Sequence, residues 1–426
     1  MNANVHLVTI VADDLTGTLD TAQGFAVRGH ETAVVPVPAD GHGDATPASP
    51  VVGVNTDSRY ADAERAAPAV RDVVESVPAE TVYKKVDSTL RGNIGAETDA
   101  ALAASGAPAA LVAPAFPEAG RTTEAGRHYV HGTPLDETEY ADDEKGASSA
   151  AVPALFEGFG RRVEHVPASD VEAGAERVRE RLDAAIAAAE HAPVVVCDAR
   201  DEDDLSTIAR AGAERDPLYV GSGGLAKHVH VPDPEAEVRA GPEPGAGAPL
   251  GVVGSVSETT LTQLDALPEA AIVELDPSAV LTPGPAEAAV ERASERLASG
   301  RPAVVTAATG EDAVERTVAV GRDRGLSDAE IRERVATGLA ATGAAVVRAE
   351  APAGLFYTGG DVAVAGLRAL DAAVVELAGE AVETGIPLGW VADGDAAGTR
   401  LATKAGGFGE RETIVNCLEA LAGNDE

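Results

Sequence analysis

The feature of this chain that most constrains its fold is an alternation of short, β-branched apolar runs with Ala-rich amphipathic stretches. Continuous apolar strands that alternate with helices are typical of a parallel sheet with helices on both faces. The strands expected in the first half are residues 5–11, 33–37, 51–55, 81–86, 110–113, 194–197 and 218–220. The helices expected between them are residues 62–77, 97–104 and 171–190.

The alternation stops at residues 231–249, where Pro, Gly and Ala accumulate without any period. Such a composition indicates a linker. The alternation then resumes, with strands expected at residues 250–253, 271–275, 303–306, 354–357 and 374–377. The sequence therefore predicts two three-layer α/β domains with mostly parallel sheets, residues 1–230 and 250–426. A cleft between two such domains is the commonest place for a small-molecule site, so the active site is expected there.

The charge of the chain limits its partners. The 426 residues carry 70 Asp and Glu against 33 Lys and Arg, a net charge of −37. Such a field repels nucleic acids and anionic membrane surfaces, which excludes both as general partners. Few lysines, many acidic groups and small apolar residues suit a solvent of high salt, where screening removes the self-repulsion. We therefore expect a halophilic cytoplasmic protein.

Targeting and cysteine signals agree with that expectation. The chain enters its first apolar run without a basic leader, and no window of 18 residues is uniformly apolar. Cys197 and Cys417 lie far apart in apolar runs. This pattern predicts two buried free thiols, with neither a disulfide nor a zinc site.

The first motif with chemical content is VADDLTGTLDTA, residues 11–22. It begins at the carboxyl end of the first expected strand, where open α/β sheets bind their ligands. Asp13 and Asp14 could hold sugar hydroxyls or accept a hydroxyl proton. The alternative is that one of the two only caps the following helix.

Two further motifs follow other strand ends. YKKVDSTLRGN, residues 83–93, places Asp87 and Ser88 where they can bond hydroxyls, and the planar fork of Arg91 suits a carboxylate. A surface loop with an ordinary capping residue is the weaker reading. PAFPEAGRTT adds Arg121 and Thr122 as donors on a Pro-stiffened loop.

The segment YVGSGGLAK, residues 219–227, contains G-x-G-x-x-A after a strand and formally matches the dinucleotide fingerprint. The acidic residue that the fingerprint requires after the next strand falls in the linker. We therefore expect only a Gly-rich turn that leads into a short helix.

Three Gly-rich turns in the second half, residues 251–264, 355–367 and 403–413, each follow an apolar run. Glycine allows backbone N–H groups to approach phosphates closely, and a helix N-terminus adds a favourable dipole. Three such turns in one domain predict a polyphosphate site. G-x-x-x-x-G-K-[ST] is absent, which excludes a P-loop NTPase, and so is the protein-kinase loop with H-R-D.

Taken in order, ADDLTG, KKVDSTLRGNIGAE, PAFPEAGRTT, GSGGLA, GSVSETT, TGGDVA and TKAGGFG resemble the motifs of the four-carbon acid sugar kinase family. The resemblance extends from about residue 5 to residue 420. It implies an N-terminal acid-sugar domain, a C-terminal nucleotide domain and ATP-dependent phosphorylation of threonate, erythronate or 3-oxo-tetronate at the terminal hydroxyl. Sugar acid and ATP are the implied partners. Mg²⁺ is expected with ATP because the charge of the nucleotide must be neutralised, and a homodimer is the expected assembly.

Carried over motif by motif, the resemblance implies site residues. Asp13 and Asp14 are the expected catalytic residues, with Asp87 as the alternative proton acceptor. The implied substrate contacts are Asp14, Asp87, Ser88, Arg91, Arg121 and Thr122, with Arg91 on the carboxylate. The implied ATP contacts are Ser257, Gly359, Gly360, Asp361, Val362 and Gly406. Asp361 is the best candidate for a metal ligand, and a shell of phosphate oxygens and water alone is the alternative. Val362 stands where members often have Thr, and Thr18 where Ala or Ser is usual.

Two other functions stay open at this point. A non-catalytic sensor of the sugar acid or nucleotide would use the same loops. An NAD-dependent dehydrogenase would use the turn at residues 221–226, and this is the less favoured of the two.

Overall fold

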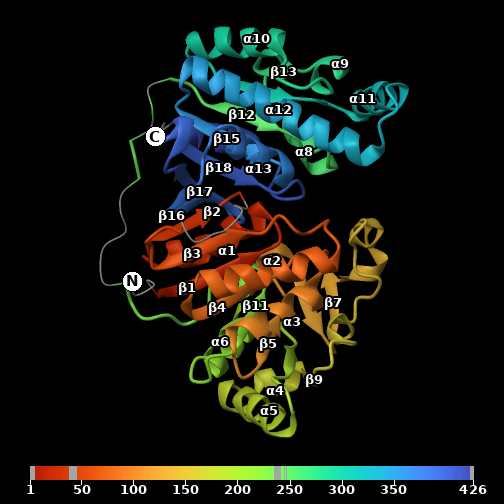
Figure 1. Cartoon of the computed structure of the whole chain (residues 1–426), viewed down its shortest axis with the longest axis vertical. Coiled ribbons are helices and arrows are strands. Elements are labelled where there is room, and N and C mark those ends of the chain that lie inside the picture. The colour runs from red at the N-terminus through yellow and green to blue at the C-terminus, as the bar shows by residue number, and fades with distance from the viewer. Residues whose placement is uncertain (1–4, 38–45, 235–240, 244, 246, 423–426) are drawn as a thin grey trace. The chain divides into compact units, whose positions relative to one another are not determined.

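The computed structural model describes residues 5–37, 46–234, 241–243, 245 and 247–422. Contacts within the chain divide it into two compact units, Met1–Glu237 and Val238–Glu426, which are coloured red to green and green to blue in Figure 1. Residues 235–240, 244 and 246 of the expected linker lie outside the described residues.

The strands of the first unit form a parallel series in the order β2-β3-β1-β4-β11-β5-β10-β9. They are β1 His6–Ala12, β2 Thr32–Val35, β3 Val51–Asn55, β4 Ala79–Lys85, β5 Ala110–Ala113, β9 Val163–Val166, β10 Val194–Cys197 and β11 Leu218–Gly221. The helices are α1 Leu15–Ala26, α2 Ala63–Ser76, α3 Ile94–Ser105, α4 Ala168–Glu172, α5 Ala175–Ala188, α6 Glu202–Gly212 and α7 Gly223–Ala226. The expected parallel sheet is confirmed, with β9 as a strand that the apolar pattern did not show.

Helices cover both faces of this series because its strands are apolar on both sides (Figure 1). On β3, Val52 and Val54 belong to a buried cluster with residues of α2 and α3. Gly53, between them, faces the opposite side, where a Cβ would lie 2.9 Å from the methyl of Thr18 on α1. Alternation along one strand therefore separates the α1 layer from the α2–α3 layer.

Two expectations for the first unit need correction. The single helix expected at residues 171–190 is two helices, because Gly174 has φ +101 and ends the α4 turn. The loop after β5 also contains a separate antiparallel sheet of β6 Arg121–Glu124, β7 Arg127–Val130 and β8 Thr133–Pro134. Its strands are too short and polar to give an apolar run.

In the second unit the strand order is β13-β14-β12-β15-β18-β17-β16. The strands are β12 Leu250–Val253, β13 Ile272–Glu274, β14 Ala303–Thr306, β15 Gly354–Thr358, β16 Val375–Glu383, β17 Ile386–Val391 and β18 Arg400–Lys404. The helices are α8 Glu258–Leu264, α9 Pro277–Val280, α10 Glu287–Ala298, α11 Glu311–Asp323, α12 Asp328–Glu350, α13 Gly360–Ala369 and α14 Thr413–Ala422.

The sheet of the second unit is mixed. Strands β13, β14, β12, β15 and β18 are parallel, whereas β17 pairs antiparallel with both β18 and β16. The strand expected at residues 374–377 is thus the start of a hairpin that turns at Gly385, φ +76. The sequence pattern missed the hairpin because β16 is not uniformly apolar: it contains three glutamates, none of them buried.

The second unit is also covered on both faces. Val253 and Phe356 pack in a buried cluster with α8 and α14 residues. Their neighbours face the other way, since a Cβ on Gly343 of α12 would lie 2.9 Å from Val252. Both units are therefore three-layer α/β structures with mostly parallel strands.

Two smaller expectations can be compared directly. Cys197 and Cys417 are buried free thiols, as the sequence predicts. A search of the described helices finds none with the length and apolar character needed to cross a membrane.

Candidate functional site

A cluster of charges stands at the carboxyl ends of β1 and β3 in the first unit. Asp13 follows β1 and binds Arg59 through both oxygens, with Nε–Oδ2 3.0 Å and Nη2–Oδ1 2.9 Å. Asp14 caps α1 by accepting from the backbone N–H of Gly17, and its Oδ1 lies 2.5 Å from Arg59 Nη2. Asp14 therefore does cap the helix, but the pair does more than capping requires.

The motif after β4 joins the same cluster. Asp87 Oδ1 lies 3.7 Å from Arg59 Nη2. Arg91 grips the other side of Asp87, with Nε–Oδ2 2.7 Å and Nη2–Oδ1 3.1 Å, and Thr89 donates to Oδ2 at 2.5 Å. The structure thus brings Asp13, Asp14, Asp87 and Arg91 together, as the motifs predict, although the Arg91 fork is occupied by Asp87.

Burial and charge act in opposite directions on these carboxylates. Burial alone raises the pKa of Asp13, but Arg59, with support from Lys84 and Lys85, outweighs burial and lowers it. Burial likewise raises the pKa of Asp87, and Arg91 and Arg59 bring it well below its ordinary value. Both groups are therefore ionised and hold hydrogen-bond donors well, but they are weak proton acceptors.

Arg59 is the central residue that sequence reasoning missed. It lies on the loop after β3, where the backbone N–H groups of Ser58 and Arg59 both donate to the carbonyl oxygen of Asp13. Gly92 leaves room for the same carboxylate, because a Cβ there would lie 2.7 Å from Asp13 Oδ2, and its φ of +95 also favours glycine. The available signal was the polar run NTDSR directly after an apolar strand.

The remaining predicted substrate contacts lie beside the cluster. Ser88 is buried next to Asp87, and its carbonyl oxygen lies 2.8 Å from Nε2 of His128. Burial lowers the pKa of His128 to about 4, so this histidine is neutral and structural. Arg121 and Thr122 are on β6, and the charge of Arg121 is close enough to His128 to contribute to its lowered pKa. Within the described residues, no direct contact joins Thr122 to the carboxylates of the cluster.

The formal dinucleotide turn is a Gly-rich turn into a short helix, as expected. Ser222 caps α7, and the helix has only four residues. A Cβ on Gly224 would lie 2.7 Å from the carbonyl oxygen of Ala115, so the glycine is needed for packing within the protein. The turn gives no support to a dehydrogenase.

In the second unit, the three predicted glycine turns converge. Ser257 caps α8 and donates to the carbonyl oxygen of Gly406 at 2.8 Å, and Thr260 donates to the same oxygen at 3.0 Å. A Cβ on Gly406 would lie 2.3 Å from Ser255 Oγ. The turns after β12 and β18 are thus held within hydrogen-bond distance of each other.

The turn after β15 completes this group. Gly359 has φ +97, and its N–H donates to the carbonyl oxygen of Lys404 at 3.3 Å. Gly360 and Asp361 begin α13, and the next side chain, Val362, is buried against Gly254, where a Cβ would lie 2.2 Å from it. All six predicted ATP residues therefore belong to three adjoining strand-end turns.

Lys404 holds the backbone of these turns in place through its buried side chain. Its side chain is buried and donates to Thr260 Oγ1 and to the carbonyl oxygens of Ala405, Gly406 and Phe408, at 3.0–3.3 Å. Burial lowers the pKa of Lys404 to about 8. The lysine thus organises the loop backbone from within the protein.

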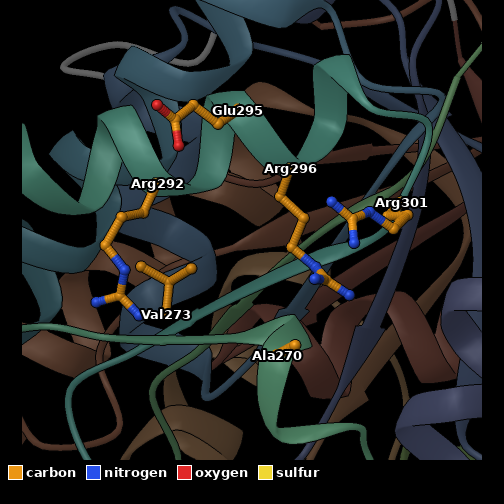
Figure 2. A pocket seen from close by; sticks show the side chains of 6 residues that line it. All are labelled: Ala270, Val273, Arg292, Glu295, Arg296 and Arg301. Carbon is orange, nitrogen blue, oxygen red and sulfur yellow. The ribbon is translucent and has the colours of Figure 1, made fainter.

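A separate hollow of about 250 Å³ lies between α10 and the start of β13, as Figure 2 shows. Its lining residues are Ala270, Val273, Arg292, Glu295, Arg296 and Arg301. Arg301 precedes β14, which runs parallel to β12, so this hollow is at the amino ends of the strands. The glycine turns are at the carboxyl ends, and none of the predicted site residues lines the hollow.

Comparison with known proteins finds one family model in each of the two compact units. Residues 8–229 match the model described as "Sugar-binding N-terminal domain", and residues 250–414 match "Nucleotide-binding C-terminal domain". The chain belongs to the four-carbon acid sugar kinase family. It is accordingly a kinase of four-carbon sugar acids, with a sugar-binding and a nucleotide-binding domain in that order.

Curated relatives match over nearly their whole length. A D-threonate kinase of Bordetella bronchiseptica is 39% identical over 427 residues, 97% of both chains. A D-erythronate kinase of Heliobacterium modesticaldum is 33% identical, with 97% of each chain covered. A 3-oxo-tetronate kinase of Methylobacterium radiotolerans is 32% identical, covering 97% of this chain and 98% of the relative. The relatives thus act on three different acids.

Solved structures give the same fold. A crystal structure of a Salmonella typhimurium protein has a TM-score of 0.78 at 22% identity, and the match covers 97% of this chain and 99% of the other. This likeness extends along the whole chain and concerns the fold alone.

Proposed function

We propose that this sugar-acid kinase transfers the γ-phosphoryl group of ATP to the terminal hydroxyl of its substrate, and that D-threonate is the preferred acid. The relatives named D-threonate kinase reach 39% identity, against 33% and 32% for the erythronate and 3-oxo-tetronate kinases. Position of the hydroxyl and choice of acid are the two parts of this proposal that experiments must decide.

The observation that carries the proposal is the Arg59 cluster. Three carboxylates from two strand-end loops are held around one guanidinium. Such carboxylates accept hydrogen bonds from neighbouring hydroxyls, which a polyhydroxy acid supplies. Asp13, Asp14, Asp87 and Ser88 are the proposed hydroxyl contacts, and Arg121 and Thr122 the outer ones.

The chemical step needs an oxygen nucleophile and a proton acceptor. The substrate O–H bond breaks as its oxygen bonds to the γ-phosphorus, and ADP leaves. Asp14 is the proposed proton acceptor. Asp13 is held more tightly by both nitrogens of Arg59, so its part is to keep that arginine and Asp14 in place.

The glycine turns are the proposed triphosphate site. Ser257, Gly359, Gly360, Asp361, Val362 and Gly406 surround a region where backbone N–H groups and the α8 and α13 N-termini can bond phosphate oxygens. Among the described residues, no group of three His, Cys, Asp or Glu side chains is arranged so that it could hold a metal ion. Mg²⁺ would therefore be held mainly by phosphate oxygens and water, with Asp361 as the protein carboxylate. Mg²⁺ would neutralise charge on the phosphates.

The expected interdomain cleft, a homodimer, a halophilic habit and a cytoplasmic location stay predictions. The proposal itself requires only that the first unit binds the acid and the second binds the nucleotide.

A coupled ADP-release assay tests the function directly. The full-length protein, in molar KCl with Mg-ATP, is offered D-threonate, D-erythronate and 3-oxo-tetronate. We expect ADP release with at least one acid, highest kcat/KM with D-threonate, and a product phosphorylated at C4. Binding of acid and ATP without ADP release would instead favour the sensor, and turnover with a different acid would move the substrate assignment only.

A further inference from the structure

The chain has five lysines, and three of them are buried: Lys84, Lys85 and Lys404. Two of the three are fully partnered. Lys84 forms an ion pair of 2.9 Å with Glu97, and Lys404 donates to four oxygen atoms. Lys85 is only 4% exposed. Among the described residues, its ammonium group has no hydrogen bond and no ion pair within 4.0 Å.

Lys85 is the last residue of β4 and faces the Arg59 cluster. Its Nζ lies 2.6 Å from the point where a Cβ on Gly17 would be, and Asp14 Oδ1 lies 2.5 Å from the same point. The ammonium charge is also close enough to act on Asp13, Asp87 and Asp20. Lys85 is thus near four carboxylates, and other donors already occupy the oxygens of Asp13, Asp14 and Asp87.

An ammonium group that is removed from water with its donors unused costs free energy unless a partner binds it. The two neighbouring arginines are already bound to carboxylates of the cluster, although each keeps an Nη1 group without a hydrogen bond to them. The fork of Arg59 is taken by Asp13 and Asp14, and that of Arg91 by Asp87. Lys85 differs from both arginines, because in the described part of this cluster no carboxylate holds its ammonium group and all of its donors remain for a ligand.

We propose that Lys85 binds the carboxylate of the sugar acid and thereby makes the enzyme select acids over neutral polyols. This inference rests on the proposed function, because it concerns the acid bound by the first unit. It moves the carboxylate contact from Arg91, where the motif placed it, to the lysine beside Gly17. Arg91 then acts as a positioning residue that holds Asp87.

The first test uses the unaltered protein. Binding of D-threonate is compared with binding of D-threitol, in which CH₂OH replaces the carboxylate, by titration calorimetry in molar KCl. A charged hydrogen bond to a buried carboxylate predicts a preference of about 10- to 100-fold for the acid. Equal affinities for acid and polyol would overturn the proposal without any variant.

The second test uses Lys85→Met, with Lys227→Met as the control. Lys227 lies in the same unit, but its ammonium is in a partly exposed ion pair with Glu118. We expect Lys85→Met to bind D-threonate about 10- to 100-fold more weakly, to bind D-threitol as before, and to leave the KM for ATP unchanged. The control keeps its preference for the acid.

Other outcomes separate this inference from the function. If the unaltered enzyme phosphorylates a sugar acid but Lys85→Met keeps its acid preference, the inference is wrong and the kinase stands. A fall in kcat alone, with the KM for the acid unchanged, would also overturn it, since the lysine would then act on the phosphoryl group. Should Lys85→Met lack a cooperative melt, Lys85→Arg replaces it and must keep the preference for the acid over the polyol.

Discussion

The candidate sites of the two units are held together by different kinds of contact. In the first, side-chain charges do the work, because Arg59 holds three carboxylates and each bond is an ion pair. In the second, side chains hold the backbone of the turns, because Ser257, Thr260 and Lys404 all donate to the carbonyl oxygen of Gly406. A small acid with several hydroxyls is specified by directed side chains, whereas a triphosphate needs close access to backbone N–H groups.

This contrast teaches that the two halves should fail differently. Changes of charge should damage the first unit and spare nucleotide binding. Changes of backbone space should damage the second and spare acid binding. The predictions below are ordered from the largest expected effect to the smallest.

The largest effect is expected for Arg59→Met. Removing this guanidinium leaves Asp13, Asp14 and Asp87 without their shared partner, and breaking a buried ion pair by one member costs about 3–5 kcal/mol. We expect acid binding to become undetectable by calorimetry and the free energy of unfolding to fall by that order. Arg65→Met, an exposed arginine on α2, is the control and should change neither. If a folded Arg59→Met protein lost affinity for ATP as well as for the acid, the two units would not differ as described.

The matching change in the second unit is Gly406→Ala. A Cβ there would lie 2.3 Å from Ser255 Oγ and 3.3 Å from Ser257 Oγ, so the turns must move apart. We expect the KM for ATP to rise by about 10- to 100-fold, as a strain of about 1–3 kcal/mol implies, with acid affinity unchanged. Gly310→Ala is the control, because no atom lies within 4 Å of its Cβ position. Steady-state kinetics with each substrate varied in turn decides the outcome.

A smaller effect concerns Asp20 on α1, whose Oδ2 would lie 2.4 Å from a Cβ on Gly223. Burial is the main cause that raises the pKa of Asp20 to about 6. The charges of Asp14 and Glu118 also raise this pKa, whereas those of Lys85 and Lys227 lower it. In the unfolded chain the group ionises near its ordinary value of 3.8. Its contribution to stability is therefore complete below pH 3.8 and is lost as the pH rises through 6.

Asp20→Asn should accordingly stabilise the ligand-free protein at pH 8 by up to about 3 kcal/mol, and by less at pH 5. Denaturant unfolding at both pH values, in the same molar KCl, measures the difference. Asp72→Asn removes an exposed carboxylate from α2 and should give no such pH dependence. An equal gain at both pH values would mean that ionisation of Asp20 is not the cause.

Much of the fold was predictable because its signals are local. The buried strands β3, β5, β10, β12 and β14 coincide with uniformly apolar runs, which need no knowledge of their neighbours. The hairpin of β16 and β17 was not predicted, because one face of it is polar and its pairing depends on which strand it meets. The break at Gly174 was missed for a related reason, since a single positive φ leaves the apolar period intact.

The site divides in the same way. Asp13, Asp14, Asp87 and Arg91 stand at strand ends, and parallel strands bring such ends to one edge of a sheet. Arg59 escaped notice because its loop carries no Gly-rich or paired-acid signal, and its importance appears only when three carboxylates meet it. The ion pair of Arg91 joins residues only four positions apart, but the motif alone did not show that Asp87 rather than a ligand holds the arginine. That no carboxylate holds the ammonium of Lys85 appears only in the described structure, because the neighbouring carboxylates come from other strand ends.

By itself the sequence determined the two α/β units, the family, and the residue types that each strand-end turn offers, because apolar period and motif order are properties of short segments. Only the tertiary structure decided which charges are paired. Pairing depends on distances of a few ångströms, mostly between residues tens of positions apart in the sequence. These distances distinguish the arginines, which bind the carboxylates of the cluster, from Lys85, whose ammonium group can still bind a ligand.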